Sequence, residues 1–409
     1  MKSLCRFCKS NLELSFANLG FAPPSNDYLN EKDLNFSESY IPLRVLLCKK
    51  CWLAQTEDYK APEDLFKSDY AYFSSSSSTW LEHSKKFADS IIKELSLNEK
   101  SFVVELACND GYLLKNFTNK KIPCLGIEPT NSCAQKARES GINVIEKFFD
   151  ENLSNEIRIN FSKADLICAN NVLAHVPDIF GFVNGISQLL KEDGTATFEF
   201  PHLLSLMKYK QFDTIYHEHY SYLSLIFICN LLKATNLRAY KVEKIDTHGG
   251  SLRLYVCKNP SSIRTDFSVQ EIIEEEIKFG LNKEDTYSEF QQDIIRIKNN
   301  FHLFILEKYI SGKKIAAYGA AAKGNTFLNF CGIKNDLIEY VCDISPSKQN
   351  KFLPGSHIPI VDPNKIRDTK PDFIIIFPWN LKNEISNQLS YAREWGAKFI
   401  CAIPKLEIF

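Results

Sequence analysis

Four cysteines near the start of the chain have the spacing of a metal site. Cys5 and Cys8 are separated by two residues, and so are Cys48 and Cys51. A two-residue gap lets one tight turn aim both thiolates at a single tetrahedral ion, and two such turns complete a four-sulfur site. Such a site has no open coordination position, so we expect a structural zinc ion. The alternative is four unrelated free thiols.

A second group of reactive side chains is the run Tyr216-His217-Glu218-His219. It supplies two imidazoles, a carboxylate and a phenol, which are groups able to move a proton or donate a hydrogen bond. In an extended strand His217 and His219 would share one face, so the backbone must be less regular if all four side chains meet one substrate. A histidine alone is more often structural, which is how we interpret His217, whereas His219 gains from its neighbours.

The segment 101–111 is typical of a strand that enters a tight turn, and a second strand ends in Glu128. In Rossmann-like folds the turn approaches a nucleotide, and the acid binds the ribose hydroxyls. A dinucleotide site needs three glycines here, but only Gly111 is present, with Ala107 and Asn109 at the other places. A nucleoside cofactor without a pyrophosphate, S-adenosylmethionine, therefore fits better. The alternative is a turn with no ligand.

Two further motifs follow strands. The strand 164–169 leads into Asn170 and Asn171, at the sheet edge where α/β proteins bind ligands. The run 319–326 nearly matches a phosphate-binding loop, but Asn325 occupies the position of the lysine, so it fails as an ATPase signature. Lys323, two residues earlier, can meet a pyrophosphate. A glycine turn that only packs a helix on a strand is the equal alternative.

Alternating strands and helices must position these groups. We expect strands at 101–106, 122–128, 164–169 and 195–200, and helices at 131–141 and 178–191. This order is typical of a parallel sheet flanked by helices. Residues 262–311 have helical periodicity, and strands are expected again at 314–318, 338–343, 373–377 and 398–402.

These patterns predict an α/β protein with three domains. Residues 1–67 form a zinc-binding domain, and residues 68–258 form a Rossmann-like class I methyltransferase core that binds S-adenosylmethionine. Residues 259–409 supply a helical connection and a second Rossmann-like domain.

Composition narrows the class of partner. The 409 residues include 49 Lys and Arg against 50 Asp and Glu, so no basic excess exists to bind nucleic acid or an anionic membrane. The start of the chain lacks the apolar run of a secretory signal, and the apolar stretches are only strand-length. We expect a cytoplasmic protein, in which the 13 cysteines are metal ligands or buried thiols.

Together the motifs resemble the bacterial sugar C-methyltransferases, which methylate a carbon of a nucleotide-linked 4-keto-deoxysugar. The resemblance extends over essentially the whole chain. One departure is Ala107-Cys108, where family members usually carry glycine and serine. The matching runs are Cys5 to Cys51 with Leu19-Gly20 and Pro24-x-Asn26, Glu105-x-x-x-Asn109-Asp110-Gly111-Tyr112, Gly126-Ile127-Glu128-Pro129, Asn171 to His175, Tyr216 to Tyr222, Thr247 to Arg253, Tyr318 to Thr326, Pro354-Gly355 and Pro378-Trp379-Asn380.

The resemblance also implies roles. The base is His219, and around the keto sugar lie Tyr216, Glu218, His175 and one of Tyr70 and Tyr72, between which spacing does not decide. Residues expected at the cofactor are Glu105, Ala107, Asn109, Gly111, Tyr112, Glu128, Phe148, Asn170 and Asn171. Residues expected at the substrate are Ser251, Arg253, Lys323 and Asn325.

The implied reaction is transfer of a methyl group from S-adenosylmethionine to C3 of a dTDP-linked keto sugar through an enolate. We expect a monomer with a nucleotide-linked sugar as partner, and neither nucleic acid nor membrane. Two alternatives stay open: O- or N-methylation of a nucleotide sugar, which needs no enolate, and a non-catalytic sugar-nucleotide-binding module.

Overall fold

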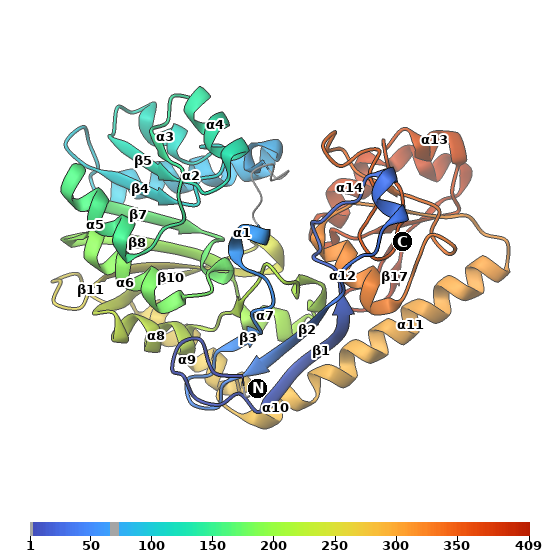
Figure 1. Ribbon diagram of the computed structural model, residues 1–409, viewed down its shortest axis with the longest axis horizontal. Coiled ribbons are helices and arrows are strands. Elements are labelled where there is room, and N and C mark those ends of the chain that lie inside the picture. Colours follow the sequence, from blue (N-terminus) through green and yellow to red (C-terminus); the bar gives the residue numbers. More distant parts are fainter. Residues whose placement is uncertain (1–2, 66–72) are drawn as a thin grey trace.

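The computed structural model describes residues 3–65 and 73–409. Its strands form three sheets, of four, seven and six strands. In Figure 1 the seven-stranded sheet and its helices lie on the left, the six-stranded sheet lies on the right, and β1 and β2 of the four-stranded sheet lie below and between them. The long helix α11 (Phe290–Ile310) runs from the four-stranded sheet toward the six-stranded one.

The seven-stranded sheet has the order β10-β11-β8-β7-β4-β5-β6. Its strands from β8 to β6 are parallel, whereas β8, β11 and β10 pair antiparallel. From β4 the strand order runs outward through β5 to β6 on one side, and from β7 it runs outward to β8 on the other. Such sheets bind ligands at the point between β4 and β7 where the order reverses. The strands are β4 (Val103–Leu106), β5 (Cys124–Ile127), β6 (Val144–Ile145), β7 (Ala164–Asn170), β8 (Leu190–Pro201), β10 (Leu237–Ile245) and β11 (Ser251–Lys258).

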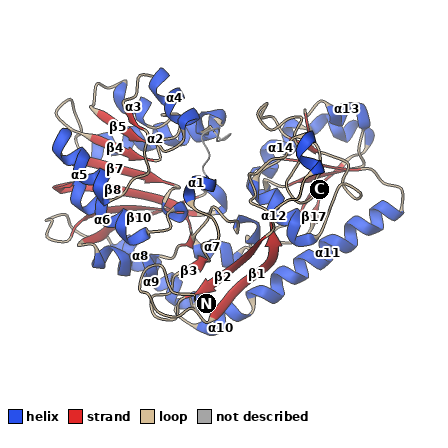
Figure 2. Cartoon of the chain, viewed as in Figure 1, coloured by secondary structure: helices blue, strands red, loops and turns tan. Residues whose placement is uncertain are grey.

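Helices cover this sheet, as Figure 2 shows. Four of them begin where a polar side chain accepts a hydrogen bond from a free N–H group of the first turn: Ser77 caps α2, Asp150 caps α5, Asp178 caps α6 and Ser224 caps α8. The predicted alternation of strands and helices is therefore confirmed. The helices are α2 (Ser78–Glu94), α3 (Leu114–Thr118), α4 (Asn131–Glu139), α5 (Glu151–Asn160), α6 (Ile179–Leu189), α7 (Leu203–Lys208) and α8 (Leu225–Ala234).

The four-stranded sheet joins distant parts of the chain. Three of its strands come from the N-terminal segment, which also contains the helix α1 (Pro62–Leu65): β1 (Leu14–Ala22), β2 (Ile41–Leu47) and β3 (Ala54–Thr56). The fourth is β9 (Ser221–Tyr222), which pairs with β3 and directly follows the Tyr-His-Glu-His run. Nothing in the sequence indicates this pairing, because β3 and β9 are too short to show a period of two.

The C-terminal part begins with the predicted connecting helices α9 (Phe267–Phe279), α10 (Glu284–Ser288) and α11. Its sheet has the order β14-β13-β12-β15-β16-β17 and is parallel except for β17. The strands are β12 (Ile315–Tyr318), β13 (Val341–Cys342), β14 (Ile360–Val361), β15 (Phe373–Ile376), β16 (Lys398–Cys401) and β17 (Glu407–Ile408), and the helices are α12 (Ala322–Cys331), α13 (Lys365–Thr369) and α14 (Lys382–Gln388).

The apolar core crosses the boundaries of the predicted domains. Phe16 and Val45 of the N-terminal sheet share one buried cluster with Phe212, Phe327 and Phe377. The metal-site cysteines belong instead to the cluster under the seven-stranded sheet. The N-terminal segment is therefore packed against both larger parts.

A buried carboxylate fixes α9 to the seven-stranded sheet. Glu276 is fully buried and accepts hydrogen bonds from the backbone N–H groups of Leu225 (2.6 Å) and Ile226 (2.8 Å) at the start of α8. Its Oε1 also lies 2.6 Å from Nε2 of His202. Negative charge at a helix N-terminus is favourable, so this contact joins the connecting helices to the core.

None of the helices within residues 3–65 and 73–409 has the combined length and apolarity that crossing a membrane requires.

We predict that Glu276→Ala destabilises the protein by roughly 3–5 kcal/mol, because it leaves buried donors without their charged acceptor. The exposed neighbour Glu275, which pairs with Lys244, is the control, and Glu275→Ala should change stability by at most about 1 kcal/mol. Chemical denaturation followed by circular dichroism measures both. Equal stability losses for the two variants would contradict the assignment.

Candidate active site

The four cysteines predicted to bind metal lie together, with their sulfur atoms within 4.8 Å of one another. Cys5 Sγ lies 3.6 Å from Cys51 Sγ, and Cys8 Sγ lies 3.4 Å from Cys48 Sγ. Four thiolates bonded at about 2.3 Å to a tetrahedral zinc ion lie about 3.8 Å apart, so the cluster fits one such ion. Gln55 supports the site, since its Nε2 lies 3.3 Å from Cys5 Sγ.

The metal-binding segment is fastened to the backbone of the histidine run. Arg6, directly after Cys5, donates to the carbonyl oxygen of Thr56 (2.7 Å). Thr56 in turn donates through its Oγ1 to the carbonyl oxygen of His219 (3.0 Å) and through its N–H to that of Tyr220 (3.1 Å). The metal site therefore helps to hold the backbone that carries His219.

His219 is half-buried and has a defined tautomer. Its Nδ1 lies 2.7 Å from the carbonyl oxygen of Thr214, which can only accept, so Nδ1 carries the proton and Nε2 carries the lone pair. Burial lowers the pKa of His219 well below its ordinary value, and His175 lowers it further. The imidazole is thus neutral near pH 7 and able to accept a proton.

The predicted partners gather around this ring. The rings of Tyr216 and His219 lie 4.0 Å apart between centroids, and His175 meets His219 edge-on at 4.7 Å. Nδ1 of His175 donates to the carbonyl oxygen of Glu218 (2.8 Å), and burial lowers the pKa of His175 to about 4. The backbone turns here, since the N–H of His219 donates to the carbonyl of Tyr216 (2.9 Å).

Two members of the run face other parts of the chain. Nε2 of His217 donates to the carbonyl oxygen of Pro42 (3.2 Å), which agrees with a structural role. Glu218 is buried and accepts a hydrogen bond from Nδ2 of Asn26 (2.7 Å). The sequence did not single out Asn26 as a site residue, although it lies in the matched Pro-x-Asn run. Tyr70 and Tyr72 lie outside the described residues.

The cofactor turn lies at the carboxyl end of β4. Ala107, Asn109 and Gly111 all have positive φ, of 55°, 50° and 80°. Ala107 therefore adopts the left-handed region that glycine prefers, and this explains why family members usually carry glycine here. Glu128, at the end of β5, accepts hydrogen bonds from the Asn109 N–H (2.9 Å) and from Thr130 Oγ1 (2.6 Å).

The donors and acceptors of this edge suit S-adenosylmethionine. Oδ1 of Asp110, Asn170 and Asn171 are buried without a hydrogen-bond partner among the described residues. Glu105 is also buried, and burial with the charges of Asp110 and Glu128 raises its pKa well above the ordinary value. The ammonium group and ribose hydroxyls of the cofactor are donors that such acceptors require. Tyr112 is buried beside Trp80, whereas Phe148 is exposed at the surface.

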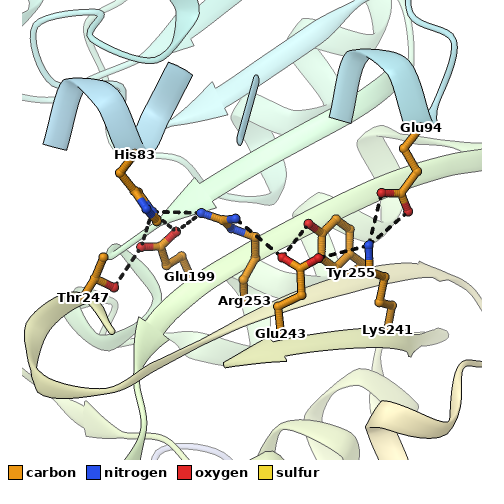
Figure 3. A network of polar contacts seen from close by, with 8 residues as sticks. All are labelled: His83, Glu94, Glu199, Lys241, Glu243, Thr247, Arg253 and Tyr255. Carbon is orange, nitrogen blue, oxygen red and sulfur yellow. Dashed lines mark hydrogen bonds and ion pairs between the residues drawn. The ribbon is translucent and has the colours of Figure 1, made fainter. Parts of the chain in front are cut away.

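A buried ion-pair network fastens α2 beside this edge (Figure 3). The fully buried Glu199 of β8 accepts from Arg253 of β11 (2.8 Å) and lies 3.0 Å from His83 of α2. Burial opposes ionisation of Glu199, but His83 and Arg253 together lower its pKa. Thr247 also donates to Glu199 (3.3 Å). His83 and Glu199 were not predicted as site residues from the sequence, because neither belongs to a recognisable motif.

The structure thus places the expected substrate residues Ser251 and Arg253 in supporting contacts. Oγ of Ser251 donates to the carbonyl oxygen of Thr247 (3.0 Å), which shapes the turn of residues 247–249. The guanidinium of Arg253 stacks 4.3 Å from the ring centroid of Phe87 while it pairs with Glu199. A role at the substrate stays a prediction for both.

Lys323 lies in the first turn of α12, which follows β12 and the turn at Gly319. Gly319 has φ of 94°, and a Cβ there would lie 2.4 Å from Pro378, so the turn requires glycine. The ammonium of Lys323 lies 4.7 Å from the ring centroid of Trp379, and burial lowers its pKa. Asn325, by contrast, is fully buried and donates to the carbonyl oxygen of Ser25 (3.2 Å), which fastens the N-terminal loop to α12.

Known protein families match three successive ranges of the chain. Family models match residues 5–66 (a zinc binding domain), 80–242 (methyltransferase domain) and 246–404 (C-methyltransferase C-terminal domain). Over 401 residues the chain is 32% identical to C-methyltransferase NovU of Streptomyces niveus, covering 98% of this chain and 95% of that one. The chain belongs to this C-methyltransferase family. It is an S-adenosylmethionine-dependent methyltransferase with a four-cysteine zinc site.

Solved methyltransferases also match parts of this C-methyltransferase. Magnesium protoporphyrin IX methyltransferase from Synechocystis PCC 6803, with bound SAM, is 13% identical and covers 44% of this chain and 81% of its own, with a TM-score of 0.33. An S-adenosylmethionine-dependent methyltransferase from Clostridium acetobutylicum ATCC 824 is 16% identical and covers 48% and 95%, with a TM-score of 0.35.

We predict that Cys48→Ser abolishes zinc binding and lowers methyl transfer, since the metal site holds the backbone of His219 through Thr56. Metal analysis of the purified variant and a methyl-transfer assay measure the two effects. Cys229→Ser, at a half-buried free thiol, is the matched control and should keep its zinc. Full zinc content in Cys48→Ser would refute the four-cysteine site.

Proposed function

We propose that this C-methyltransferase adds a methyl group to C3 of a dTDP-linked 4-keto-deoxysugar, with His219 as the base. The observation that carries the proposal is a half-buried, neutral imidazole whose Nε2 bears the lone pair. It lies beside the rings of His175 and Tyr216 and directly follows Glu218 in the chain.

Methylation of carbon requires a carbanion equivalent, and a ketone beside the target carbon supplies one. Nε2 of His219 removes the proton from this carbon, and the electrons of the broken C–H bond form an enolate. Bound S-adenosylmethionine supplies an electrophilic methyl group. The enolate carbon would accept this methyl group as the bond from the methyl group to sulfur breaks, and His219 would hold the abstracted proton.

The surroundings of His219 suit this proton transfer. The imidazolium that forms keeps its Nδ1–H bond to Thr214, and the face of Tyr216 stabilises the new positive charge. Hydrogen-bond donors near the ketone, among which we place Tyr216 and one of Tyr70 and Tyr72, stabilise the enolate oxygen. His175 stays neutral near pH 7, so the imidazolium of His219 forms without a second positive charge beside it.

The cofactor and substrate bind at facing edges in this proposal. Asn171 and Glu128 lie at the carboxyl ends of β7 and β5 and are assigned to S-adenosylmethionine. Lys323, at the start of α12, is assigned to the pyrophosphate of the nucleotide sugar, since an ammonium beside a helix N-terminus attracts phosphate. The substrate then spans from Lys323 to His219.

We predict that His219→Asn lowers kcat for methyl transfer by roughly 10²–10⁴-fold, the usual contribution of a general base, with little change in the Kd of S-adenosylmethionine. Mass spectrometry with methyl-labelled cofactor and a panel of nucleotide-linked 4-keto sugars measures it. His302→Asn, on α11, is the control and should remain active. Undiminished transfer in His219→Asn would favour O- or N-methylation instead.

We also predict that kcat/KM does not fall as the pH is lowered through 6.5, the ordinary pKa of histidine, and falls only at lower pH. The reason is that the neutral form of His219 is the active one and burial extends its range downward. The folded protein also loses stability at this lower pH, because His219 and His175 bind a proton more readily in the unfolded chain than in the folded one. Circular dichroism at each pH separates the two effects, and a limb centred above 6.5 would contradict the assignment.

A further inference from the structure

The one-turn helix of residues Phe212–Thr214 stands between the C-terminal domain and the base. Its last residue, Thr214, supplies the carbonyl oxygen that accepts the Nδ1 proton of His219. The direction of that carbonyl therefore sets the tautomer and the orientation of the imidazole. Neither of the two preceding residues has a role in the proposed reaction.

Both preceding residues are held by the C-terminal domain. The ring of Phe212 is fully buried against Phe327 and Phe330 of α12, at centroid distances of 5.7 and 5.2 Å. The carboxylate of Asp213 accepts a hydrogen bond from the indole Nε1–H of Trp379 (2.7 Å). Two contacts from the C-terminal domain thus fix a turn whose third residue holds the base.

Asp213 is an unusual residue at a domain contact. Its side chain is almost completely buried, and burial raises its pKa to about 6, while Lys323 and the Trp379 N–H oppose this rise. Burying a carboxylate is costly, so a contact that only packs two domains is better made by an apolar side chain. The acid gives the indole N–H a strong, directional acceptor.

Trp379 also touches the expected phosphate site and a second turn. The ammonium of Lys323 lies over its ring and donates to Oδ1 of Asn380 (3.4 Å). A Cβ at Gly249, where φ is 86°, would lie 2.1 Å from the far edge of the indole, so only glycine lets the ring enter. One indole therefore lies between the Lys323 ammonium and the turn that orients His219.

We propose that Asp213 and Trp379 are a positioning pair that makes the orientation of the base depend on how the C-terminal domain is docked. The C-terminal domain then does more than bind substrate: through Trp379 and Asp213 it fixes the Thr214 carbonyl and hence His219. The pair acts through His219 and does not touch the reacting atoms. The proposal rests on His219 as the base.

The decisive variant is Trp379→Phe, which removes the indole N–H and keeps a ring beside Lys323 and Gly249. We expect kcat for methyl transfer to fall about 10- to 100-fold, the cost of a small misplacement of a catalytic group. The KM of the nucleotide sugar and the Kd of S-adenosylmethionine should stay within about twofold, because no ligand contact is lost. Lys323→Ala should show the opposite pattern, a raised KM.

Further variants separate positioning from a general loss of structure. Asp213→Ala should lower kcat as Trp379→Phe does, and the double variant should be no slower than the single ones, because both remove one hydrogen bond. Asp213→Asn keeps an acceptor and should recover most of kcat. Trp395→Phe is the matched control, since it removes an indole N–H that donates to the Pro371 carbonyl elsewhere in the same domain (3.0 Å).

A measurement without substrate completes the test. In protein with ¹⁵N-labelled histidines, the Nδ1–H resonance of His219 should move in Trp379→Phe and stay in place in Trp395→Phe. Wild-type kcat in a folded Trp379→Phe, or an unmoved His219 resonance, overturns the positioning pair. Failure of the wild-type protein to methylate any keto sugar overturns the proposed function instead, while the resonance still reports on the pair.

Discussion

The structure depends on keeping one imidazole, that of His219, both neutral and correctly oriented. A histidine serves as a base near neutral pH only if its single N–H is hydrogen-bonded and its other nitrogen stays unprotonated. In this protein the Thr214 carbonyl meets the first requirement, and burial meets the second by keeping His219 neutral. Two parts of the protein contribute to that arrangement. In the four-stranded sheet β9 follows the histidine and Thr56 of β3 donates to its carbonyl oxygen, and in the C-terminal domain α12 packs against Phe212 in the turn before it.

This arrangement explains the structural role of the zinc site. A strand of three residues and one of two residues make few hydrogen bonds and bury little surface by themselves. The four cysteines lie together at one end of the paired strands β1 and β2, where β1 begins and β2 ends, and Arg6 joins them to Thr56. The metal therefore supplies stability that the short strands lack, next to the backbone of His219.

Much of this architecture could be predicted from the sequence, because its signals are local. The cysteine spacing predicted the metal cluster, and the strand that ends at Leu106 predicted the cofactor turn. The assignments that sequence could not reach are those that join distant segments. Nothing near Asn26 shows that it binds Glu218, and nothing near Asp213 shows that Trp379 donates to it. Glu199 and His83 likewise meet only after the sheet and α2 are assembled.

The most direct test of His219 as the base separates proton removal from methyl transfer. The protein is incubated in D₂O with the nucleotide-linked 4-keto sugar and S-adenosylhomocysteine, so that no methyl group is available, and NMR follows deuterium at C3. The account predicts enzyme-dependent exchange at this position in the wild-type protein and only background exchange in His219→Asn. Equal exchange in both proteins would contradict it.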